Sequence, residues 1–254
     1  MIKNIMSQKT QIIGGIHAVR TAIKHPDSQI QQIWVDNKRH DKRLFELLQS
    51  LKKTTIQLNK TNKEALDKLA PKLRHQGILA EVTLPAAKDE SSLENLLINL
   101  KKPALLLILD GITDPHNLGA CLRSADGAGV DAVIAPKDRA SGLTPVACKV
   151  ASGAAESVPF IQVTNLARTL KDLRQNYGIW TIGTADETSK TIYQADLAVP
   201  MALIMGSEEK GLRRLTREQC DELVSIPMQG MVESLNVSVA TGICLFEVNR
   251  QRYA

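Results

Sequence analysis

The chain contains 254 residues, more than one ordinary hydrophobic core requires, so two compact units are expected. Hydrophobic residues make up 43% of it and charged residues 23%, which excludes intrinsic disorder for the chain as a whole. No run of about 18 apolar residues occurs, and the first residues lack the apolar segment and cleavage site of a secretory signal. We therefore expect a cytoplasmic protein without a membrane span.

Metal-ligating residues are too dispersed to suggest a metal centre. The four cysteines lie far apart and form no CxxC pair, which favours reduced thiols over disulfides or a zinc site. The five histidines form no pair at helical spacing. The sequence therefore predicts no bound metal.

Charge divides the chain unevenly. Residues 1–88 contain 16 Lys and Arg against 7 Asp and Glu, a net charge of +9, whereas residues 89–254 contain 16 against 20, a net charge of −4. This asymmetry is typical of a basic module that binds a polyanion and is joined to a body with another task. A solvated basic surface without a partner explains the charge equally well. Only Trp34 and Phe45 are aromatic in the front part, so phosphate contact is favoured over base stacking.

Hydrophobic periodicity predicts an alternation of helices and strands in residues 1–85. Helices are predicted at residues 15–25, 43–53 and 62–70, and strands at residues 30–36, 54–59 and 78–85. This order in a segment of this length is typical of a small α/β domain. The polar stretch after Pro85 begins a linker assigned to residues 86–103, which also contains a short leucine-rich helix.

A second α/β domain is predicted for residues 104–254. Its strands are predicted at residues 104–110, 130–136, 156–163, 178–184, 201–206 and 223–228, and its helices at about 117–128, 144–153, 165–177, 214–222 and 235–250. The strands are short and almost wholly apolar, which predicts a parallel sheet covered by helices on both faces. Because ligands of such sheets bind beyond the carboxyl ends of the strands, the segments that follow the strands are the candidates for chemistry.

The first candidate segment runs from Asp110 to Ala125. A turn containing Asp, Gly and Pro leads to a helix predicted to open at Asn117, where Asn is a good N-terminal cap, and capping alone explains this residue. Arg123 follows roughly 9 Å further along the helix axis. Its side chain either lies along the protein surface or directs its guanidinium toward a phosphate.

The second candidate segment is Met205–Leu212, whose two glycines have the spacing of a Walker A loop. Leu212 and Arg213 stand where that loop has Lys and Ser or Thr, so the segment does not match a nucleoside triphosphate site. Glu208 and Glu209 would also repel a triphosphate. The loop therefore favours a cationic or hydroxyl-bearing ligand.

The third candidate segment is Ile226–Ala240. A strand ends near Pro227, and Ser234 is predicted to cap the N-terminus of the last helix. Asn236 and Ser238 place polar groups in the first turns of a helix that is otherwise apolar. These groups serve capping alone, or the free N–H groups at the helix start bind a carboxylate.

Three patterns occur in order between residues 117 and 240. They are Asn-x-Gly-x-x-x-Arg-x-Ala at 117–125, Met-Gly-Ser-Glu-x-x-Gly-Leu at 205–212, and Ile-Pro-Met followed by Ser-Leu-Asn-Val-Ser-Val-Ala within 226–240. Together they resemble the three motifs of the SpoU/TrmH family of RNA ribose 2′-O-methyltransferases, within the SPOUT superfamily. In the front module, Gly14–Val19 and Arg74–Ile78 resemble the L30e-like substrate-binding extension of one branch of that family.

This resemblance implies a fold, a reaction and partners. The fold is a C-terminal SPOUT α/β domain, residues 104–254, with a deep trefoil knot, preceded by an L30e-like RNA substrate-binding domain, residues 1–85. The reaction is methyl transfer from S-adenosyl-L-methionine to a ribose 2′-hydroxyl, and the most similar branch modifies a guanosine in 23S ribosomal RNA. A homodimer through the C-terminal domain is also implied, whereas neither a membrane nor DNA is expected as a partner.

The resemblance also implies the site residues. The cofactor contacts are Gly206, Ile226 and Leu235, with glycine permitting close backbone approach. The family's proposal makes the motif-one arginine a general base. A neutral guanidine is very costly at pH 7, so we favour a role in which Arg123 clamps a phosphate, and that phosphate or Glu208 receives the proton. The catalytic residues implied are Asn117, Arg123, Glu208, Ser234 and Asn236.

Other functions fit parts of the sequence. A nucleotide hydrolase would use the Gly206 loop and need magnesium with ATP or GTP, but the Walker A lysine is missing. An RNA-binding or ribosome-assembly protein without catalysis would carry the motifs only as a signature of the fold. The same methylation of transfer RNA is the remaining alternative.

Overall fold

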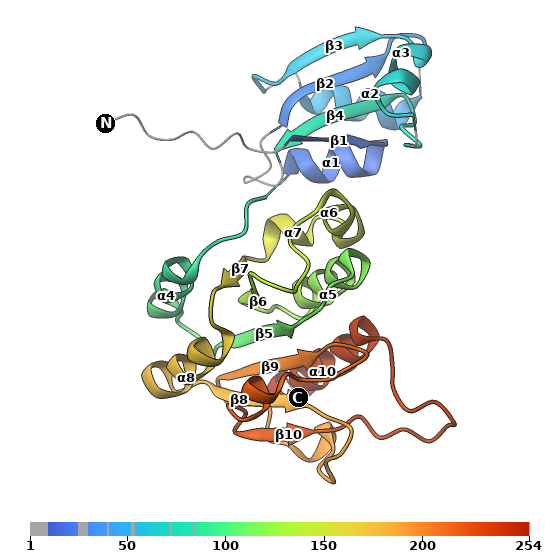
Figure 1. Cartoon of the computed structure of the whole chain (residues 1–254). Helices are drawn as coiled ribbons and strands as arrows, with labels where there is room; N and C mark the ends of the chain where they lie inside the picture. The colour runs from blue at the N-terminus through green and yellow to red at the C-terminus, as the bar shows by residue number, and fades with distance from the viewer. Residues whose placement is uncertain are drawn as a thin grey trace. The chain divides into compact units, whose positions relative to one another are not determined.

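A computed structural model of the chain describes residues 10–24, 30–39, 41–51, 54–71, 73–83 and 85–253. The chain divides into two compact units, Met1–Pro85 and Ala86–Ala254 (Figure 1). Within the described ranges, no helix is both long enough and apolar enough to cross a membrane.

Unit one contains a four-stranded sheet and three helices. Its strands are β1 (Thr10–Gly14), β2 (Ile30–Asp36), β3 (Gln57–Thr61) and β4 (Ile78–Thr83), and its helices are α1 (Ile16–Lys24), α2 (Lys42–Leu51) and α3 (Lys63–Leu69). The strand order is β1-β4-β2-β3, with β2 and β3 parallel and the other pairs antiparallel. Hydrophobic periodicity did not predict β1, because this short segment is a strand through its pairing with β4, whose register partners are 65 or more residues away in the sequence.

The two faces of this sheet have separate cores. Ile33 and Val35 of β2 pack with buried residues of α1 and α2, such as Val19 and Leu44. Trp34 lies in the second cluster, with Leu66 and Leu79. This alternation along β2 is the period of a strand with both faces covered.

The two segments of unit one that resemble the L30e-like extension lie together. The side-chain Oε1 of Gln76 accepts a hydrogen bond from Ile16 N at 3.3 Å, which satisfies a free N–H group at the start of α1. His75 Nδ1 accepts from Gly77 N at 3.0 Å, and its Nε2 lies 3.0 Å from Asp67 Oδ1. Because Nδ1 is the acceptor, the proton of the neutral ring is on Nε2, which donates to the carboxylate.

Unit two is built around six parallel strands, as the apolar runs predicted. The strands are β5 (Leu105–Asp110), β6 (Ala132–Pro136), β7 (Phe160–Val163), β8 (Trp180–Thr184), β9 (Met201–Gly206) and β10 (Glu222–Val224). Their order is β10-β8-β9-β5-β6-β7, and every neighbouring pair is parallel. The segments after β5 and β9 therefore begin side by side at the carboxyl edge of the sheet.

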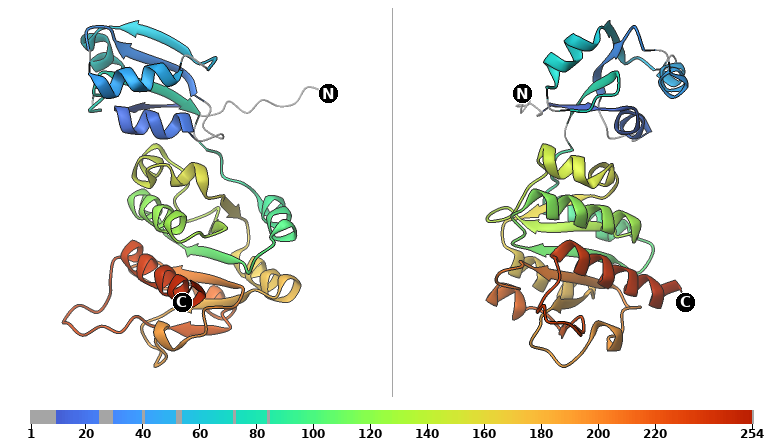
Figure 2. Two further views of the ribbon diagram at one scale, coloured as in Figure 1. Left: turned by 180° about the vertical axis from the view of Figure 1, so that it is seen from behind. Right: turned by 90° about the vertical axis from the view of Figure 1, so that its right-hand side faces the viewer.

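The helices of unit two cover both faces of this sheet (Figure 2). They are α4 (Glu90–Asn99), α5 (Pro115–Gly127), α6 (Pro145–Ala151), α7 (Ala154–Ser157), α8 (Leu166–Tyr177), the 3-10 helix η1 (Ile192–Gln194), α9 (Arg214–Arg217) and α10 (Val237–Tyr253). Leucines of β5 alternate between the two cores: Leu107 packs with α5 and α10, and Leu106 packs with α4 and α8. The α/β fold with a covered parallel sheet is thus confirmed.

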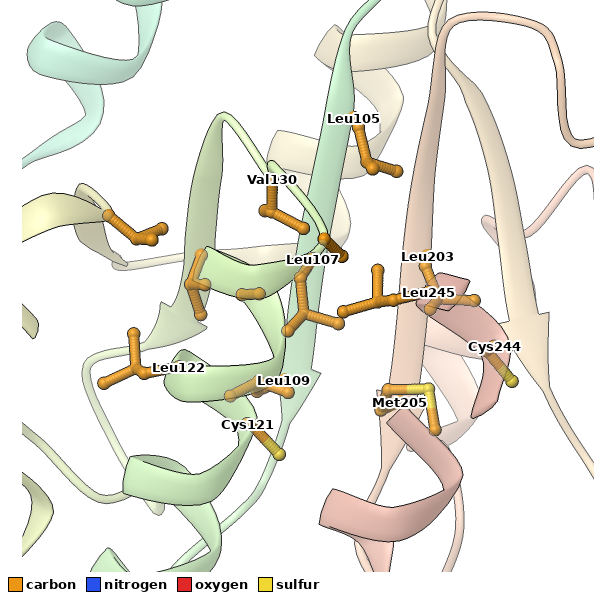
Figure 3. Packing of buried hydrophobic residues seen from close by; sticks show 14 of the residues in the cluster. Leu105, Leu107, Leu109, Cys121, Leu122, Val130, Leu203, Met205, Cys244 and Leu245 are labelled. Carbon is orange, nitrogen blue, oxygen red and sulfur yellow. The ribbon is translucent and has the colours of Figure 1, made fainter. Parts of the chain in front are cut away.

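The first of these cores joins the central strands to two helices. Side chains from β5, β9, α5 and α10 meet in it, and Figure 3 shows Leu107 and Leu109 beside Leu203 and Met205, with Leu245 of α10 close by. This contact fixes α10 against the two central strands. It therefore also fixes the start of α10, where the third motif lies.

Several predicted elements of unit two differ from the structure in extent. The strand predicted at 223–228 is β10, which ends at Val224. The strand predicted at 156–163 begins only at Phe160, because Ser152 and Gly153 have positive φ angles and the chain then makes the helical turn α7. The helix predicted at 214–222 ends at Arg217. Asp221 accepts hydrogen bonds from Thr181 N and Oγ1, which draws the following residues onto β8 as strand β10.

Candidate active site

A pocket opens at the carboxyl ends of β8, β9 and β10. Its volume is about 340 Å³, which lies within the range of small-molecule sites. The predicted cofactor contacts Gly206, Ile226 and Leu235 all line it, as do Glu208 and Ser234. The pocket therefore contains residues of the second motif, which follows β9, and of the third motif, which follows β10. Only β8 lies between these two strands in the sheet.

Side chains from all three motifs meet at Glu208. Its Oε1 accepts from Asn117 Nδ2 at 3.2 Å, from Asn236 Nδ2 at 2.6 Å and from Val237 N at 3.1 Å. Asn236 Nδ2 also lies 2.9 Å from Asn117 Oδ1, the acceptor of a further hydrogen bond. Residues up to 119 positions apart in the sequence thus form one hydrogen-bonded cluster, in which the carboxylate is the shared acceptor.

The cap of α5 differs from the prediction. The helix begins at Pro115, and the carboxylate of Asp114 accepts from His116 N at 2.8 Å. Proline is favoured at this first position because it has no N–H to satisfy and its φ already suits a helix. Asn117 is therefore not the cap, and its side chain is free to contact Glu208.

The cap of α10 also differs from the prediction. The helix begins at Val237, and Asn236 rather than Ser234 caps it: Asn236 Oδ1 accepts from Ser238 N at 3.0 Å and from Ser238 Oγ at 2.6 Å. Ser234 is an exposed residue of the preceding loop and lines the pocket. Asn236 thus combines the capping role with contact to the other two motifs.

Glycine at position 206 is required by the protein backbone. A Cβ atom there would lie 2.2 Å from the carbonyl carbon of Gly211 and 2.4 Å from Leu212 N. We expected the glycine to permit close approach of the cofactor to the backbone, but the space beside its Cα is occupied by the backbone of Gly211 and Leu212. The residue permits a tight turn in which Ser207 and Gly211 exchange backbone hydrogen bonds of 3.0 and 2.8 Å.

Arg123 lies apart from the cluster. It is exposed on α5, and within the residues that the structure describes its side chain forms no hydrogen bond or ion pair. The neighbouring Leu122 is fully buried, so the helix directs the arginine outward while its apolar side is packed. An unpaired guanidinium at the surface is available to an anionic partner.

The pocket is rich in carboxylates. Asp186, Glu187, Glu209 and Glu233 line it in addition to Glu208, against the two cationic residues Lys210 and Arg217. A hydrogen bond from its own backbone and then the Arg217 guanidinium, which donates to Glu187 Oε2 at 3.1 Å, hold the pKa of Glu187 below its usual value. The pocket therefore suits a ligand with positive charge. The described residues contain no cluster of three potential metal ligands.

One buried carboxylate of the site was overlooked as a candidate. Asp110 ends β5, is 1% exposed and pairs with Arg213, which follows the second motif. The sequence contained a signal for it, since Asp110 directly follows five apolar strand residues. An acidic residue at the end of a buried strand is itself expected to be buried, and a buried carboxylate requires a partner. Its partner, 103 positions later, had no such signal.

Known proteins match both units of the chain. Residues 104–246 match the family model described as "SpoU rRNA Methylase family", and residues 12–87 match the model "RNA 2'-O ribose methyltransferase substrate binding". The chain is 55% identical over 240 residues to the 23S rRNA (guanosine-2'-O-)-methyltransferase RlmB of Haemophilus influenzae, an alignment covering 94% of this chain and 97% of that protein.

Solved structures share the fold. A structure described as an RNA 2'-O ribose methyltransferase superposes with a TM-score of 0.78 at 28% identity, covering 98% of this chain and 91% of the other. The SpoU methyltransferase AviRb from Streptomyces viridochromogenes, in complex with AdoMet, gives a TM-score of 0.78 at 24% identity, covering 96% and 90%. With the three motifs joined at one cluster and family models matched in both units, the chain belongs to the SpoU rRNA methylase family.

Proposed function

We propose that the chain transfers a methyl group from S-adenosyl-L-methionine to the ribose 2′-hydroxyl of a guanosine in 23S ribosomal RNA. The observation that carries this proposal is the meeting of Asn117, Glu208 and Asn236 at the edge of the pocket. The Haemophilus influenzae relative, similar over nearly its whole length, is named for this reaction.

The pocket fits the cofactor in size and charge. Ile226 and Leu235 offer apolar surface for an adenosine, and the backbone from Gly206 to Leu212 offers hydrogen-bonding groups. The carboxylates around the pocket suit the positive sulfonium. When bound, S-adenosyl-L-methionine supplies an electrophilic methyl group, and the residues of this chain have to align the ribose with it.

The chain's own residues orient the alcohol and accept its proton. An alcohol is a poor nucleophile until its proton is being removed, so the site has to combine alignment with a proton acceptor. Arg123, exposed and unpaired among the described residues, holds the adjacent phosphate. That phosphate or the Glu208 carboxylate receives the proton. Ser234 and Asn236 orient the 2′-oxygen, and Asn117 holds Glu208 in place.

A homodimer through unit two is part of the proposal. On α10, Val239, Phe246 and Tyr253 are 51%, 55% and 80% exposed and stand seven residues apart, so they form one apolar stripe. A second copy of the helix would bury this stripe in a symmetric interface. Phe246→Asp should convert the dimer into monomers in light scattering at micromolar concentration, whereas Phe45→Asp, in the other unit, should not.

The knot and the compartment are also proposed. The chain passes from the edge strand β10 back to α10, which packs against β9 and α5 near the centre of the sheet. This return is consistent with the trefoil knot of the SPOUT superfamily. A substrate in ribosomal RNA suits the cytoplasm.

Unit one is proposed as the RNA-binding module. It contains nearly all of the basic segment 1–88, and Arg74 is exposed in the loop that contacts the start of α1. Lys72, which we also expect to contact phosphate, lies outside the described residues. Arg74→Glu with Lys72→Glu should weaken RNA binding, reduce the salt dependence of that binding and leave cofactor binding intact. Affinity that does not change with salt would indicate a solvated basic surface instead.

The test of the reaction uses purified protein, methyl-labelled S-adenosyl-L-methionine and transcripts of 23S ribosomal RNA and transfer RNA. We expect label in the ribose of a single guanosine of the 23S transcript, and its loss with Arg123→Ala while cofactor binding is retained. RNA binding without label transfer would identify a non-catalytic protein. Label only in transfer RNA would overturn the substrate assignment.

A further inference from the structure

Asp110 closes the base of the loop that carries Glu208. In the sheet, Asp110 is the register partner of Gly206, the residue at which β9 ends and the loop begins. Its carboxylate Oδ2 accepts a hydrogen bond from Arg213 N at 2.8 Å, directly after the loop ends. One residue of β5 therefore holds both ends of the segment from Ser207 to Leu212.

Because Asp110 is buried, its negative charge depends on the guanidinium of Arg213 for stabilisation. The Asp110 side chain is fully buried, and its Oδ1 accepts no hydrogen bond within the described part of the chain. Arg213 Nε lies 3.5 Å from that oxygen and is the one cation within ion-pair distance among the described residues. A buried carboxylate is costly without a charged partner, so removing the Arg213 guanidinium would leave an uncompensated charge at Asp110.

Arg213 also connects a third loop. Its Nη2 donates to the carbonyl oxygen of Arg139, in the segment after β6, at 3.1 Å. Gly111, with φ +83°, follows Asp110, and a Cβ atom there would lie 3.3 Å from the same Nη2. The guanidinium therefore packs against the segments that follow β5 and β6, while its backbone belongs to the segment that follows β9.

We propose that Asp110 and Arg213 are positioning residues that hold the loop Ser207–Leu212 so that Glu208 contacts Asn117 and Asn236. The inference rests on the proposed function for its rate effects, but the contact it explains exists without substrate. Loss of the pair releases the loop at its base, and the carboxylate moves away from its donors. A displacement of about 1 Å at a catalytic group lowers a rate by up to roughly 100-fold.

A double-mutant cycle tests whether Arg213 acts through Glu208. Single-turnover methylation is measured for Arg213→Gln, Glu208→Gln and the double variant, with cofactor and RNA saturating. We expect Arg213→Gln to lower the rate about 10- to 100-fold and to have little further effect when Glu208 is already replaced. Arg213→Lys should recover part of the rate, since an ammonium still faces Asp110.

Arg214→Gln is the matched control, because Arg214 is the adjacent arginine and pairs with Glu218 on the exposed side of α9. It should change the rate less than about twofold, as expected for a surface ion pair. If Arg213→Gln lowers the rate by the same factor with and without Glu208, Arg213 supports the fold only, and the positioning role is wrong. An unchanged rate in Arg213→Gln would overturn it as well.

A second measurement reads the contact without activity. Val237 N donates to Glu208 Oε1, so hydrogen exchange of this amide reports whether Glu208 is in place. We expect faster exchange of the Val237 amide in both Arg213→Gln and Glu208→Gln, and wild-type exchange in Arg214→Gln. If the wild-type protein does not methylate RNA, the proposed function fails, while this measurement still decides the positioning role. If the Val237 amide of Arg213→Gln exchanges at the wild-type rate, the positioning role is wrong.

Discussion

Replacing Gly206 by alanine separates two explanations for a glycine in the second motif. A Cβ atom at this position would lie 2.2 to 2.6 Å from backbone atoms of Gly211 and Leu212. Backbone cannot rotate away as a side chain can, so restoring ordinary contact at 3.4 Å requires the loop to move by roughly 1 Å. The alternative explanation is that the cofactor needs this space.

The expected loss of stability is that of an overpacked site. Substitutions that insert an atom into filled space cost about 1–3 kcal/mol of unfolding free energy, which corresponds to a decrease in Tm of about 2–12 °C for a unit of this length. We expect this decrease in the protein without cofactor or RNA, measured by calorimetry, together with faster hydrogen exchange in residues 206–213. Weaker cofactor binding follows as a consequence.

Gly230→Ala is the control for this prediction, because a Cβ atom at Gly230 would meet nothing within 4 Å and its φ is not in the left-handed region. Its Tm should stay within about 4 °C of wild type, since a permitted Gly to Ala change alters stability by less than about 1 kcal/mol. If Gly206→Ala has the wild-type Tm and exchange but binds cofactor weakly, the side chain occupies ligand space and our explanation is refuted.

Three further predictions concern packing, the arginine and the thiols. Gly119→Ala should lower the Tm, because its Cβ would lie 2.5 Å from the Ala147 carbonyl oxygen, whereas Gly127→Ala in the same helix should not, and equal Tm values would contradict this. Arg123→Lys should lower the single-turnover rate at every pH from 6 to 10, and Arg123→Ala should lower it further; recovery of the lysine variant at high pH would instead identify a general base. Burial raises the pKa of Cys244 to about 12, so roughly one thiol in ten thousand is ionised at pH 8, and iodoacetamide should react far more slowly with this thiol in native than in urea-unfolded protein. Equal rates would show that Cys244 is accessible in the native state.

Local patterns predicted the parts of the fold that depend on local composition. The apolar run ending at Asp110 predicted a buried parallel strand, and the structure contains it. The predicted start of α5 is two residues late, because Asp114 and Asn117 are both good N-terminal caps and the structure uses Asp114, with Pro115 as the first helical residue. The strand β1 was missed, because its pairing with β4 lies outside any local window.

The site depends on contacts that no local pattern contains. Asn117 and Glu208 meet because β5 and β9 are neighbours in the sheet, although eight helices and strands separate them in the chain. Asn236 joins them because α10 packs against α5 and β9. The rule that ligands bind at the carboxyl ends of strands predicted the edge of the sheet, and the family resemblance supplied the residues. Neither revealed that Asp110 and Arg213 close the base of the Glu208 loop, since this pair spans 103 positions.

The most direct test of the central claim is a map of ribose 2′-O-methylation across the ribosomal RNAs of cells with and without the gene for this chain. The account predicts that one guanosine in 23S ribosomal RNA loses its methyl group in the deletion strain. The wild-type gene should restore it, whereas the Arg123→Ala gene should not. An unchanged methylation map of 23S ribosomal RNA would contradict the account.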